Sequence, residues 1–298
     1  MKYIFLMINK RNIILILAIS VFSCHIKEQQ AEVIRVMTFN IRYDNPQDGV
    51  NAWPNRKDLV AGLIRFYGPA LFGVQEALYG QMKDLEERLP DYTWVGVGRD
   101  DGDKQGEFSA IFYRDDRYEK QDSGTFWLSE TPSTRGSLGW DAACVRIVTW
   151  VKMTDRMSGK TFYMFNTHFD HRGVVAREKS AELLISKVNE IAGDFPAIIT
   201  GDFNSPDSSI IYKILTNTAD IKKDIKRHFK DSKLISQTAA YGPDATFNGF
   251  GRSDHAQRID YIFVTDPFGV QKYGVLCEHW NGIYPSDHMP VLADLSLP

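Results

Sequence analysis

Polar clusters at the ends of apolar runs constrain this chain more than any other feature of its sequence. Six of them lie between residues 38 and 288: Thr38-Phe39-Asn40, Gln75-Glu76, Asn166-Thr167-His168, Gly201-Asp202-Phe203-Asn204, Arg258-Ile259-Asp260-Tyr261 and Ser286-Asp287-His288. The short apolar runs beside them are typical of buried strands, and a strand fixes the direction of the residue next to it. We therefore expect the folded chain to gather the six clusters into one site.

The spacing of apolar residues predicts an alternation of helices and strands from residue 33 onward. Helical spacing predicts helices over 56–67, 81–89, 174–191 and 207–215. Continuous or alternating apolar runs predict strands over 33–39, 70–74, 92–97, 108–113, 125–128, 144–153, 161–166, 196–200, 259–264, 270–276 and 290–295. This order predicts an α/β fold with sheets in the core and helices outside, in one domain over residues 33–298.

The N-terminal segment has the pattern of an export signal. Residues 1–12 carry three basic residues and no acid, and residues 13–23 form an apolar run that is too short to span a bilayer comfortably. The run Val21-Phe22-Ser23-Cys24 resembles a bacterial lipobox, in which Cys24 is lipidated and residues 24–32 form a tether. The protein is then expected outside the cytoplasm, anchored to a membrane in the periplasm or at the cell surface. An uncleaved anchor and a plain signal with an incidental cysteine are the alternatives.

Charge and cysteine content limit the partners of the exported chain. Without residues 1–23, 32 Lys and Arg face 38 Asp and Glu, a net charge of −6. Proteins that grip long nucleic acids usually carry a basic face, so the charge counts against such a partner, and we expect a monomer. Cys144 and Cys277 stand in apolar runs. One disulfide, which export would permit, and two buried free thiols remain equally open, and neither cysteine is assigned a catalytic role.

Carboxylates after buried strands are the first candidates for chemistry. Glu76 directly follows an apolar run, where a carboxylate is costly unless it is paired or bound to a metal. A hard cation such as Mg²⁺ prefers oxygen ligands, so Glu76 is the leading metal ligand, with a surface acid as the alternative. Asp202 and Asn204 stand two residues apart and point the same way if the segment is extended. An Asx-rich turn is the alternative there.

Two histidines add groups that titrate near neutral pH. His168 and His288 each stand at the end of a strand-like run and beside an acid. Asp260 is placed to orient one of these imidazoles, as carboxylates do in hydrolytic triads. The Asn40 amide is a candidate hydrogen-bond donor to a phosphate oxygen or a metal-bound water. A lone histidine is more often structural, so the pair carries the prediction.

Together these motifs resemble the endonuclease/exonuclease/phosphatase superfamily, which includes deoxyribonuclease I, abasic-site endonucleases, sphingomyelinases, inositol-polyphosphate 5-phosphatases and poly(A) deadenylases. The resemblance covers residues 33–296 in the order of the family. The Gly201-Asp202-Phe203-Asn204 and Ser286-Asp287-His288 motifs are specific in combination. The resemblance implies a four-layer α/β sandwich, with two packed mixed sheets flanked by helices, and hydrolysis of phosphoesters.

The resemblance also implies the residues that bind a metal and activate water. Glu76 would bind Mg²⁺ or Mn²⁺, supported by Asn40 and Asp287. Asp202 would position or deprotonate the attacking water, and Asn204 would hold a phosphoryl oxygen.

The resemblance assigns the two imidazoles to the phosphoryl group. His288 would contact the phosphate or assist proton transfer with Asp260 behind it, and His168 would stabilise the transition state or the leaving group. Glu107 resembles the acid that supports the active-site histidine in deoxyribonuclease I, so we expect it to pair with His168. Arg42 departs from the pattern, because abasic endonucleases usually carry an acid there, and this puts a second metal in doubt.

Two loops rich in Gly, Pro, Asn and Trp, residues 44–56 and 126–141, are expected to line the substrate pocket. Their indoles would stack on a sugar, a base or a glycerol face, and the alternative is that they plug the core edge: Trp53, Trp127 and Trp140. Arg146 lies in an apolar run, and its guanidinium suits bidentate hydrogen bonding to phosphate, with a buried ion pair as the alternative. Arg172, next to His171, would add a phosphate or sugar contact.

The leading hypothesis is a lipid-anchored, Mg²⁺-dependent phosphodiesterase or phosphatase that acts outside the cytoplasm on small organic phosphates. The substrate stays open because the fold hosts many. An extracellular nuclease is the second hypothesis, and the negative charge of the mature chain counts against it. A catalytically silent carbohydrate- or glycolipid-binding surface protein is the third. A phospholipase remains open but would need an exposed apolar loop at the pocket mouth.

Overall fold

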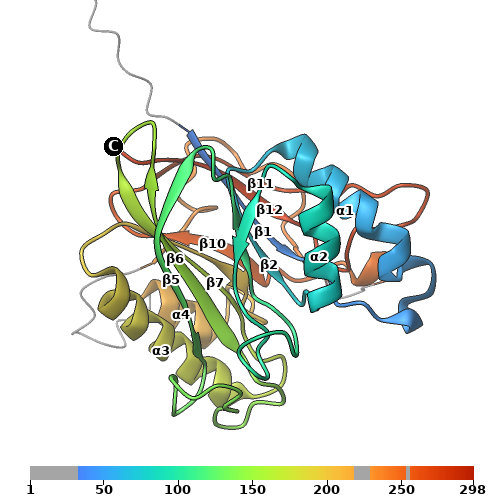
Figure 1. The fold of residues 1–298 in the computed structure, drawn as a ribbon, viewed down its shortest axis with the longest axis horizontal. Coiled ribbons are helices and arrows are strands. Elements are labelled where there is room, and N and C mark those ends of the chain that lie inside the picture. Colours follow the sequence, from blue (N-terminus) through green and yellow to red (C-terminus); the bar gives the residue numbers. More distant parts are fainter. Residues whose placement is uncertain (1–32, 218–228, 253–255) are drawn as a thin grey trace, which may run out of the picture. The chain divides into compact units, whose positions relative to one another are not determined.

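Two packed sheets with helices on both outer faces form the fold (Figure 1). The computed structural model describes residues 33–217, 229–252 and 256–298. The predicted signal, the predicted lipidation site Cys24 and the predicted tether lie outside these described residues. No helix within the described ranges has the length and hydropathy that a bilayer span requires.

The first sheet contains β1 and carries α1 (Trp53–Tyr67) and α2 (Tyr79–Arg88) on its outer face. Its strands are β1 (Val33–Asn40), β2 (Leu71–Gln75), β3 (Thr93–Val95), β4 (Ile111–Tyr113), β11 (Gly269–Val275) and β12 (Val291–Ser296). They follow the order β11-β12-β1-β2-β4-β3. A short 3₁₀ segment, η1 (Pro46–Asn51), connects β1 to α1.

The second sheet carries α3 (Val174–Ala192) and α4 (Ile210–Thr216) on its outer face. Its strands are β5 (Tyr118–Trp127), β6 (Ile147–Asp155), β7 (Thr161–His168), β8 (Ala197–Asp202), β9 (Lys230–Asp231) and β10 (Asp260–Val264). They follow the order β5-β6-β7-β8-β10-β9. A second 3₁₀ segment, η2 (Gly249–Gly251), precedes β10.

Apolar side chains fill three layers that correspond to this architecture. One buried cluster lies between the sheets, with Val36, Met164 and Ile262 among its members. The other two lie between each sheet and its helices. The predicted α/β sandwich of two mixed sheets flanked by helices is therefore confirmed.

Some predicted boundaries were wrong. The predicted strand 125–128 is the end of β5, which begins at Tyr118. Residues 119–122 are exposed on this edge strand, so their polar character hid the strand from the apolar pattern. The predicted strand 108–113 shortens to Ile111–Tyr113, preceded by isolated bridges at Phe108.

The strand directions bring the polar clusters to one edge of the sandwich. β1 and β2 are parallel, and so are β7 and β8, so each pair ends at the same edge. β12 and β10 run antiparallel to their neighbours β1 and β8, so both begin at that edge. The register places His168 and Asp260 on either side of Asp202.

A buried amide joins the two sheets beneath this edge. Asn166 of β7 donates through Nδ2 to the carbonyl oxygens of Val74 (2.8 Å) and Ala110 (2.9 Å) in the other sheet. Its Oδ1 accepts from Gln75 Nε2 (2.6 Å) and Thr200 Oγ1 (3.0 Å). A Cβ on Gly73 would stand 2.3 Å from this Oδ1, so glycine leaves the space that the amide occupies.

Asn166→Ala should lower the free energy of unfolding by about 3 kcal/mol, because each buried polar group left without its partner costs roughly 1–3 kcal/mol. Equilibrium urea denaturation measures the change. The exposed Asn55 provides a matched control, and Asn55→Ala should shift the free energy by no more than about 0.5 kcal/mol. Equal effects of the two substitutions would show that the amide does not hold the sheets together.

Candidate active site

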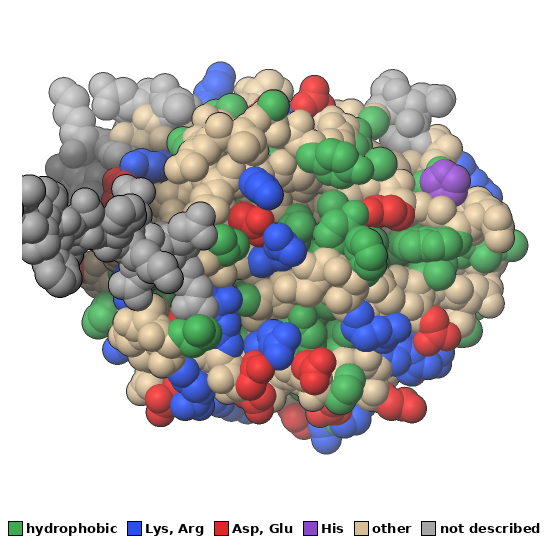
Figure 2. Space-filling model, turned by 90° about the horizontal axis from the view of Figure 1, so that it is seen from above, with side chains coloured by type: hydrophobic (Ala, Val, Ile, Leu, Met, Phe, Trp, Pro, Cys, Tyr) green, Lys and Arg blue, Asp and Glu red, His purple; other side chains and the backbone are tan. Residues whose placement is uncertain are grey.

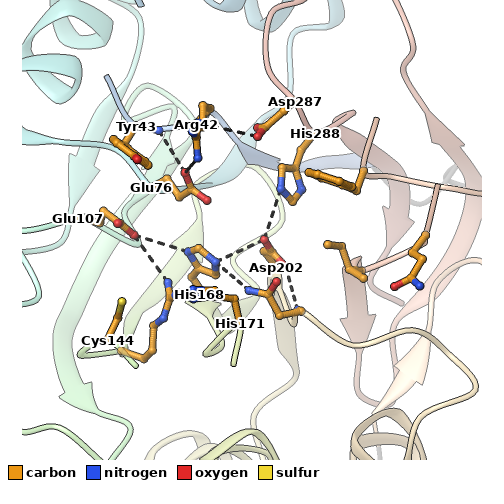
Figure 3. A pocket seen from close by; sticks show the side chains of 15 residues that line it. Arg42, Tyr43, Glu76, Glu107, Cys144, His168, His171, Asp202, Asp287 and His288 are labelled. Atoms are coloured by element: carbon orange, nitrogen blue, oxygen red, sulfur yellow. Dashed lines mark hydrogen bonds and ion pairs between the residues drawn. The ribbon is translucent and has the colours of Figure 1, made fainter. Parts of the chain in front are cut away.

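A cavity of about 780 Å³ opens at the edge where the polar clusters meet (Figure 3). Both sheets and the loops after β1 and before β10 supply its walls. The lining residues are Arg42, Tyr43, Glu76, Glu107, Cys144, Arg146, His168, His171, Asp202, Asn204, Phe247, Gln257, Ile259, Asp287 and His288. A cavity of this size suits a small organic molecule.

Asn40, at the end of β1, connects acids of the two sheets. Its Nδ2 donates to Glu76 Oε1 (3.0 Å) and to Asp202 Oδ2 (3.0 Å). Its Oδ1 accepts the backbone N–H of Arg42 (3.0 Å), which fixes the orientation of the amide. Two predicted metal-site residues, Asn40 and Glu76, and the predicted water-activating residue Asp202 are therefore joined by hydrogen bonds.

Backbone strain is concentrated at this site. Seven of the described non-glycine residues have a positive φ, and three of them belong to the cavity wall: Arg42 (57°), Glu76 (63°) and Asn204 (46°). Such conformations cost of order 1 kcal/mol each and persist where the surroundings impose them. At Glu76 the strained turn directs the carboxylate back over the strand ends, where Tyr43 N–H donates to Oε2 (3.2 Å).

His288 is held by acids on both sides of its ring. Nδ1 lies 2.9 Å from Asp260 Oδ2, and Nε2 lies 3.7 Å from Asp202 Oδ2. Burial acts to lower the pKa of His288, but the charges of Asp260 and Asp202 outweigh it and raise the pKa well above its usual value. His288 is therefore a charged imidazolium at neutral pH. Phe247 packs edge-on against the ring at 5.1 Å.

His168 has the opposite protonation state. Burial and the positive charges of Arg146 and Arg99 lower its pKa well below the usual value, so the ring is neutral. Asn204 Nδ2 lies 3.0 Å from His168 Nε2 and also donates to the carbonyl of Phe169 (2.9 Å). These contacts occupy the amide hydrogens that we expected to hold a phosphoryl oxygen. In this arrangement Asn204 orients His168.

Glu107 lies near His168 without the expected hydrogen bond. Its Oε2 is 3.8 Å from His168 Nδ1, and Arg99 Nη1 binds it instead at 2.5 Å. Burial and then the charge of Glu76 raise the pKa of Glu107, against the effect of Arg99. The guanidinium of Arg99 binds the Glu107 carboxylate. Glu107 therefore lies close to His168 but forms no hydrogen bond with it.

Asp202 occupies the centre of the site (Figure 3). It lies 3.4 Å from His168 Nε2 and accepts from Asn40 and from the backbone N–H of Asn204 (2.8 Å). Burial and the charge of Asp260 raise the pKa of Asp202 to about 7, against the charge of His288. A carboxylate with this pKa can exchange a proton near neutral pH.

Glu76 and Asp287 form an acidic pair that suits a hard divalent cation. Burial and the charge of Glu76 raise the pKa of Asp287, partly offset by His288. A nearby cation would relieve this repulsion, and carboxylate oxygens are the donors that Mg²⁺ and Mn²⁺ prefer. The ligands Glu76 and Asp287, with Asn40 beside them, therefore fit the predicted metal.

Two further groups of side chains have the spacing of metal ligands. One consists of Asp202, Asp260 and His288, in which Asp260 Oδ2 bonds to His288 Nδ1 and Asp260 Oδ1 has no hydrogen-bond partner among the described residues. Asp170, which lies with Cys144 and His171 in the second, accepts four backbone N–H groups through its two oxygens. Asp170 thus holds loops in place.

Both described cysteines are free thiols, and neither is buried as one alternative expected. Cys144 is half-buried in the cavity wall, and Cys277 is exposed.

The tryptophan-rich loops do not line the cavity. Trp53, the first residue of α1, is buried, and its indole N–H donates to Asp84 (2.8 Å). Trp127 is buried, and its N–H donates to the carbonyl of Arg99 (2.7 Å). Trp140 is half-buried outside the lining set. The predicted stacking role is therefore wrong for this cavity, because none of the three indoles lines it and the rings of Trp53 and Trp127 are buried.

The two predicted arginines have different positions. Arg146 lines the cavity, is almost fully buried, and its Nε and Nη1 lack hydrogen-bond partners among the described residues. Nη1 lies 3.6 Å from Glu107 and Nε lies 3.8 Å from Asp170, so the buried ion pair given as the alternative is present. The place of Arg146 in the cavity wall also suits the predicted contact with substrate. Arg172 is exposed and does not line the cavity, whereas the neighbouring His171 does.

Arg56 helps to build the site, although the sequence predicted only that it belongs to a loop lining the pocket. Its guanidinium is fully buried and donates to backbone carbonyls alone: those of Ile41, Arg42, Tyr43, Asn51 and Pro285. It thereby fastens the loop after β1 to the segment that carries Asp287 and His288. An arginine three residues after a Trp-Pro helix start was the available signal.

Three further lining residues had no sequence signal. They come from connecting segments without periodicity: Tyr43, Phe247 and Gln257. Ile259 belongs to the predicted strand 259–264 and lies directly before β10. Phe247 reaches the site through an isolated bridge to His288, a contact that local sequence does not encode.

We predict that the imidazoles of His288 and His168 have opposite protonation states at neutral pH in chelator-treated protein. At pH 7.5 long-range ¹H–¹⁵N NMR should show His288 charged and His168 neutral, with His288→Gln and His168→Gln assigning the signals. By linkage, the His288 contribution to stability is complete below pH about 6.5 and is lost as pH rises through its folded pKa. The His168 contribution is present above pH about 6.5 and is lost as pH falls. Titration of both rings together near pH 6.5 would contradict this assignment.

Comparison with known proteins agrees with this geometry. A family model described as the Endonuclease/Exonuclease/phosphatase family matches residues 37–288. The solved structure of an endonuclease/exonuclease/phosphatase from Bacteroides vulgatus is 45% identical, with 90% of this chain and 100% of that chain covered and a TM-score of 0.84. A mannosyl-6-phosphatase from Bacteroides thetaiotaomicron VPI-5482 is 36% identical, with 89% and 100% covered and a TM-score of 0.81.

A more distant structure shares the fold alone. The human nocturnin catalytic domain is 21% identical, with 89% of this chain and 93% of that chain covered and a TM-score of 0.67. The family match over most of the chain and the two bacterial structures carry the assignment. The chain belongs to the endonuclease/exonuclease/phosphatase family and is a phosphoester hydrolase.

Proposed function

We propose that this phosphoester hydrolase depends on a divalent cation and acts outside the cytoplasm on small organic phosphates, sugar phosphates among them. One observation carries the proposal: Glu76, Asp202, Asp287 and both imidazoles converge on a single cavity of about 780 Å³. A mannosyl-6-phosphatase that is 36% identical supports a sugar phosphate as the substrate class.

The cation would be held by Glu76 and Asp287, with Asn40 adjacent. When bound, Mg²⁺ or Mn²⁺ supplies a Lewis acid that neutralises charge on phosphoryl oxygens. Asn40 keeps the carboxylate of Glu76 and that of Asp202 at fixed positions, because its Nδ2 donates to both. The proposed metal ligand and the proposed water-activating carboxylate are therefore held at a fixed position relative to each other.

Proton transfer is assigned to Asp202 and His288. Asp202, with a pKa of about 7, accepts the proton of the attacking water. His288 is charged and donates to a phosphoryl oxygen, while Asp260 holds its ring. His168 is neutral, is oriented by Asn204, and stabilises the leaving group or the transition state.

An extracellular nuclease is the second candidate. Figure 2 shows one face on which Lys and Arg side chains are interspersed with Asp and Glu, without a continuous basic strip. A long polyanion needs such a strip, so this face gives the nuclease no support. Membership of a hydrolase family also leaves the catalytically silent binding protein without support.

The location remains a proposal that rests on the sequence of residues 1–32. The basic start, the apolar run and Cys24 favour a lipid-anchored protein in the periplasm or at the cell surface. We propose a monomer with no nucleic-acid partner. Mass spectrometry of the mature N-terminus from cells tests the anchor, because lipidation adds acyl chains to Cys24.

We expect purified residues 31–298, the compact unit of the chain, to hydrolyse small phosphoesters only when a divalent cation is present. The assay compares mannose 6-phosphate, p-nitrophenyl phosphate, bis(p-nitrophenyl) phosphate and DNA, each with Mg²⁺, with Mn²⁺ and with chelator. Chelator-sensitive release of phosphate or p-nitrophenol supports the proposal. Turnover that persists in chelator, or cleavage of DNA alone, would overturn it.

Asp202→Ala should reduce kcat by about 10³-fold, because it removes the group that accepts the proton of water. Folding should be unchanged by circular dichroism. Asp244, whose side chain is 95% exposed, supplies the control, and Asp244→Ala should retain full activity. An Asp202→Ala enzyme within about tenfold of the wild-type rate would exclude Asp202 as the water-activating residue.

A further inference from the structure

Arg42 places a guanidinium beside both carboxylates of the proposed metal pair. Nη1 lies 3.8 Å from Glu76 Oε2, and Nε lies 3.8 Å from Asp287 Oδ2. These distances exceed hydrogen-bond length. Nη1 makes no hydrogen bond to any described residue, and Arg42 lines the cavity (Figure 3). A donor group therefore faces the space where a phosphoryl group would bind.

The position of this guanidinium is built by the loop after β1. Asp48 accepts from Nε (3.1 Å) and Nη2 (3.2 Å), and Asn45 Nδ2 donates to the same carboxylate (3.2 Å). Arg42 also lies over the ring of Tyr43, 4.3 Å from its centroid. Its backbone is in the left-handed region with φ of 57°. A side chain fixed by two hydrogen bonds loses little further entropy when it binds a ligand.

We infer that Arg42 is a substrate-binding residue that selects phosphomonoesters over diesters, and this inference rests on the proposed function. A monoester carries up to two negative charges and three terminal oxygens, whereas a diester carries one charge and two such oxygens. With the cation on Glu76 and Asp287, Arg42 provides a second fixed positive charge on the same side of the cavity. Guanidinium groups bind such oxygens with directed hydrogen bonds. The guanidinium of Arg42 would therefore pair with the additional negative charge that a monoester carries.

A purely structural role makes a different prediction for metal binding. If Arg42 only holds the loop, its loss should loosen Asn40 and Glu76 and weaken both metal and phosphate. If Arg42 binds substrate, its loss removes a positive charge that repels the metal, so metal binding is kept or strengthened while phosphate binding weakens. Only under the substrate-binding role does phosphate affinity fall without a fall in metal affinity.

The test compares wild-type protein with Arg42→Met and Arg42→Lys by titration calorimetry. Mg²⁺ alone is the first ligand, and inorganic phosphate in saturating Mg²⁺ is the second. Arg114 is the matched control, because it forms a similar two-point pair with Asp116 elsewhere on the surface. Glu76→Gln provides the reference for weakened Mg²⁺ binding, and circular dichroism checks the fold of each variant.

For Arg42→Met we expect Mg²⁺ affinity equal to or several-fold tighter than wild type, and phosphate affinity at least about tenfold weaker, a loss of about 1.4 kcal/mol. Arg42→Lys should recover part of the phosphate affinity, and Arg114→Met should match wild type. The kcat/KM of Arg42→Met should fall about 100-fold for p-nitrophenyl phosphate and less than tenfold for bis(p-nitrophenyl) phosphate, as one charge contact of a few kcal/mol predicts.

Parallel loss of Mg²⁺ and phosphate affinity, or equal loss of monoester and diester turnover, would overturn the inference. If wild-type protein hydrolyses neither nitrophenyl ester nor mannose 6-phosphate, the proposed function fails, and the phosphate titration still decides the role of Arg42. Unchanged phosphate affinity in Arg42→Met would refute that role even where activity is present.

Discussion

The hydrogen bonds of Asn166 fix how one sheet sits on the other, and the whole site depends on that relation. Asn40, Glu76, Asp287 and His288 belong to the first sheet or its flanking loops, whereas His168, Asp202, Asn204 and Asp260 belong to the second. Apolar side chains between sheets tolerate small sliding movements, because their contacts have no direction. The Asn166 amide has directed bonds to both sheets, close to Gln75 and so to Glu76. A shift of one sheet would therefore strain these bonds together with the bond between Asn40 and Asp202.

Arg56 provides a second constraint, because it fixes loops that lie outside the strands. Arg56 binds only carbonyl oxygens and has no carboxylate partner among the described residues, so burial lowers its pKa to about 10. Its charge remains, and lies behind the acidic pair at Glu76 and Asp287. Arg42 and Arg56 together therefore offset acids that would otherwise repel one another. The two guanidinium charges thus reduce the repulsion between the carboxylates of Glu76 and Asp287.

The sequence predicted the parts of the site that follow from strand direction. A residue directly after a buried strand has few possible positions, so Glu76, Asp202 and His168 were identified from the chain alone. Loops carry no such rule. Tryptophan in the loop at 44–56 suggested stacking, but Trp53 turns inward and the neighbouring Arg56 organises the site. Phe247 was not predicted, because its contact with His288 joins residues from different loops. The Glu107–His168 pair was displaced by Arg99, a competing charge whose approach only the folded structure reveals.

The length of β1 separates the beginning of this central strand from the site. The strand begins at Val33 and ends at Asn40, so with eight residues at about 3.3 Å each its two ends are roughly 25 Å apart. Asn40 stands beside the cavity, whereas Val33 lies at the far end of the strand. Substitutions around Val33 can therefore alter the stability of the sandwich without reaching the groups that carry the chemistry.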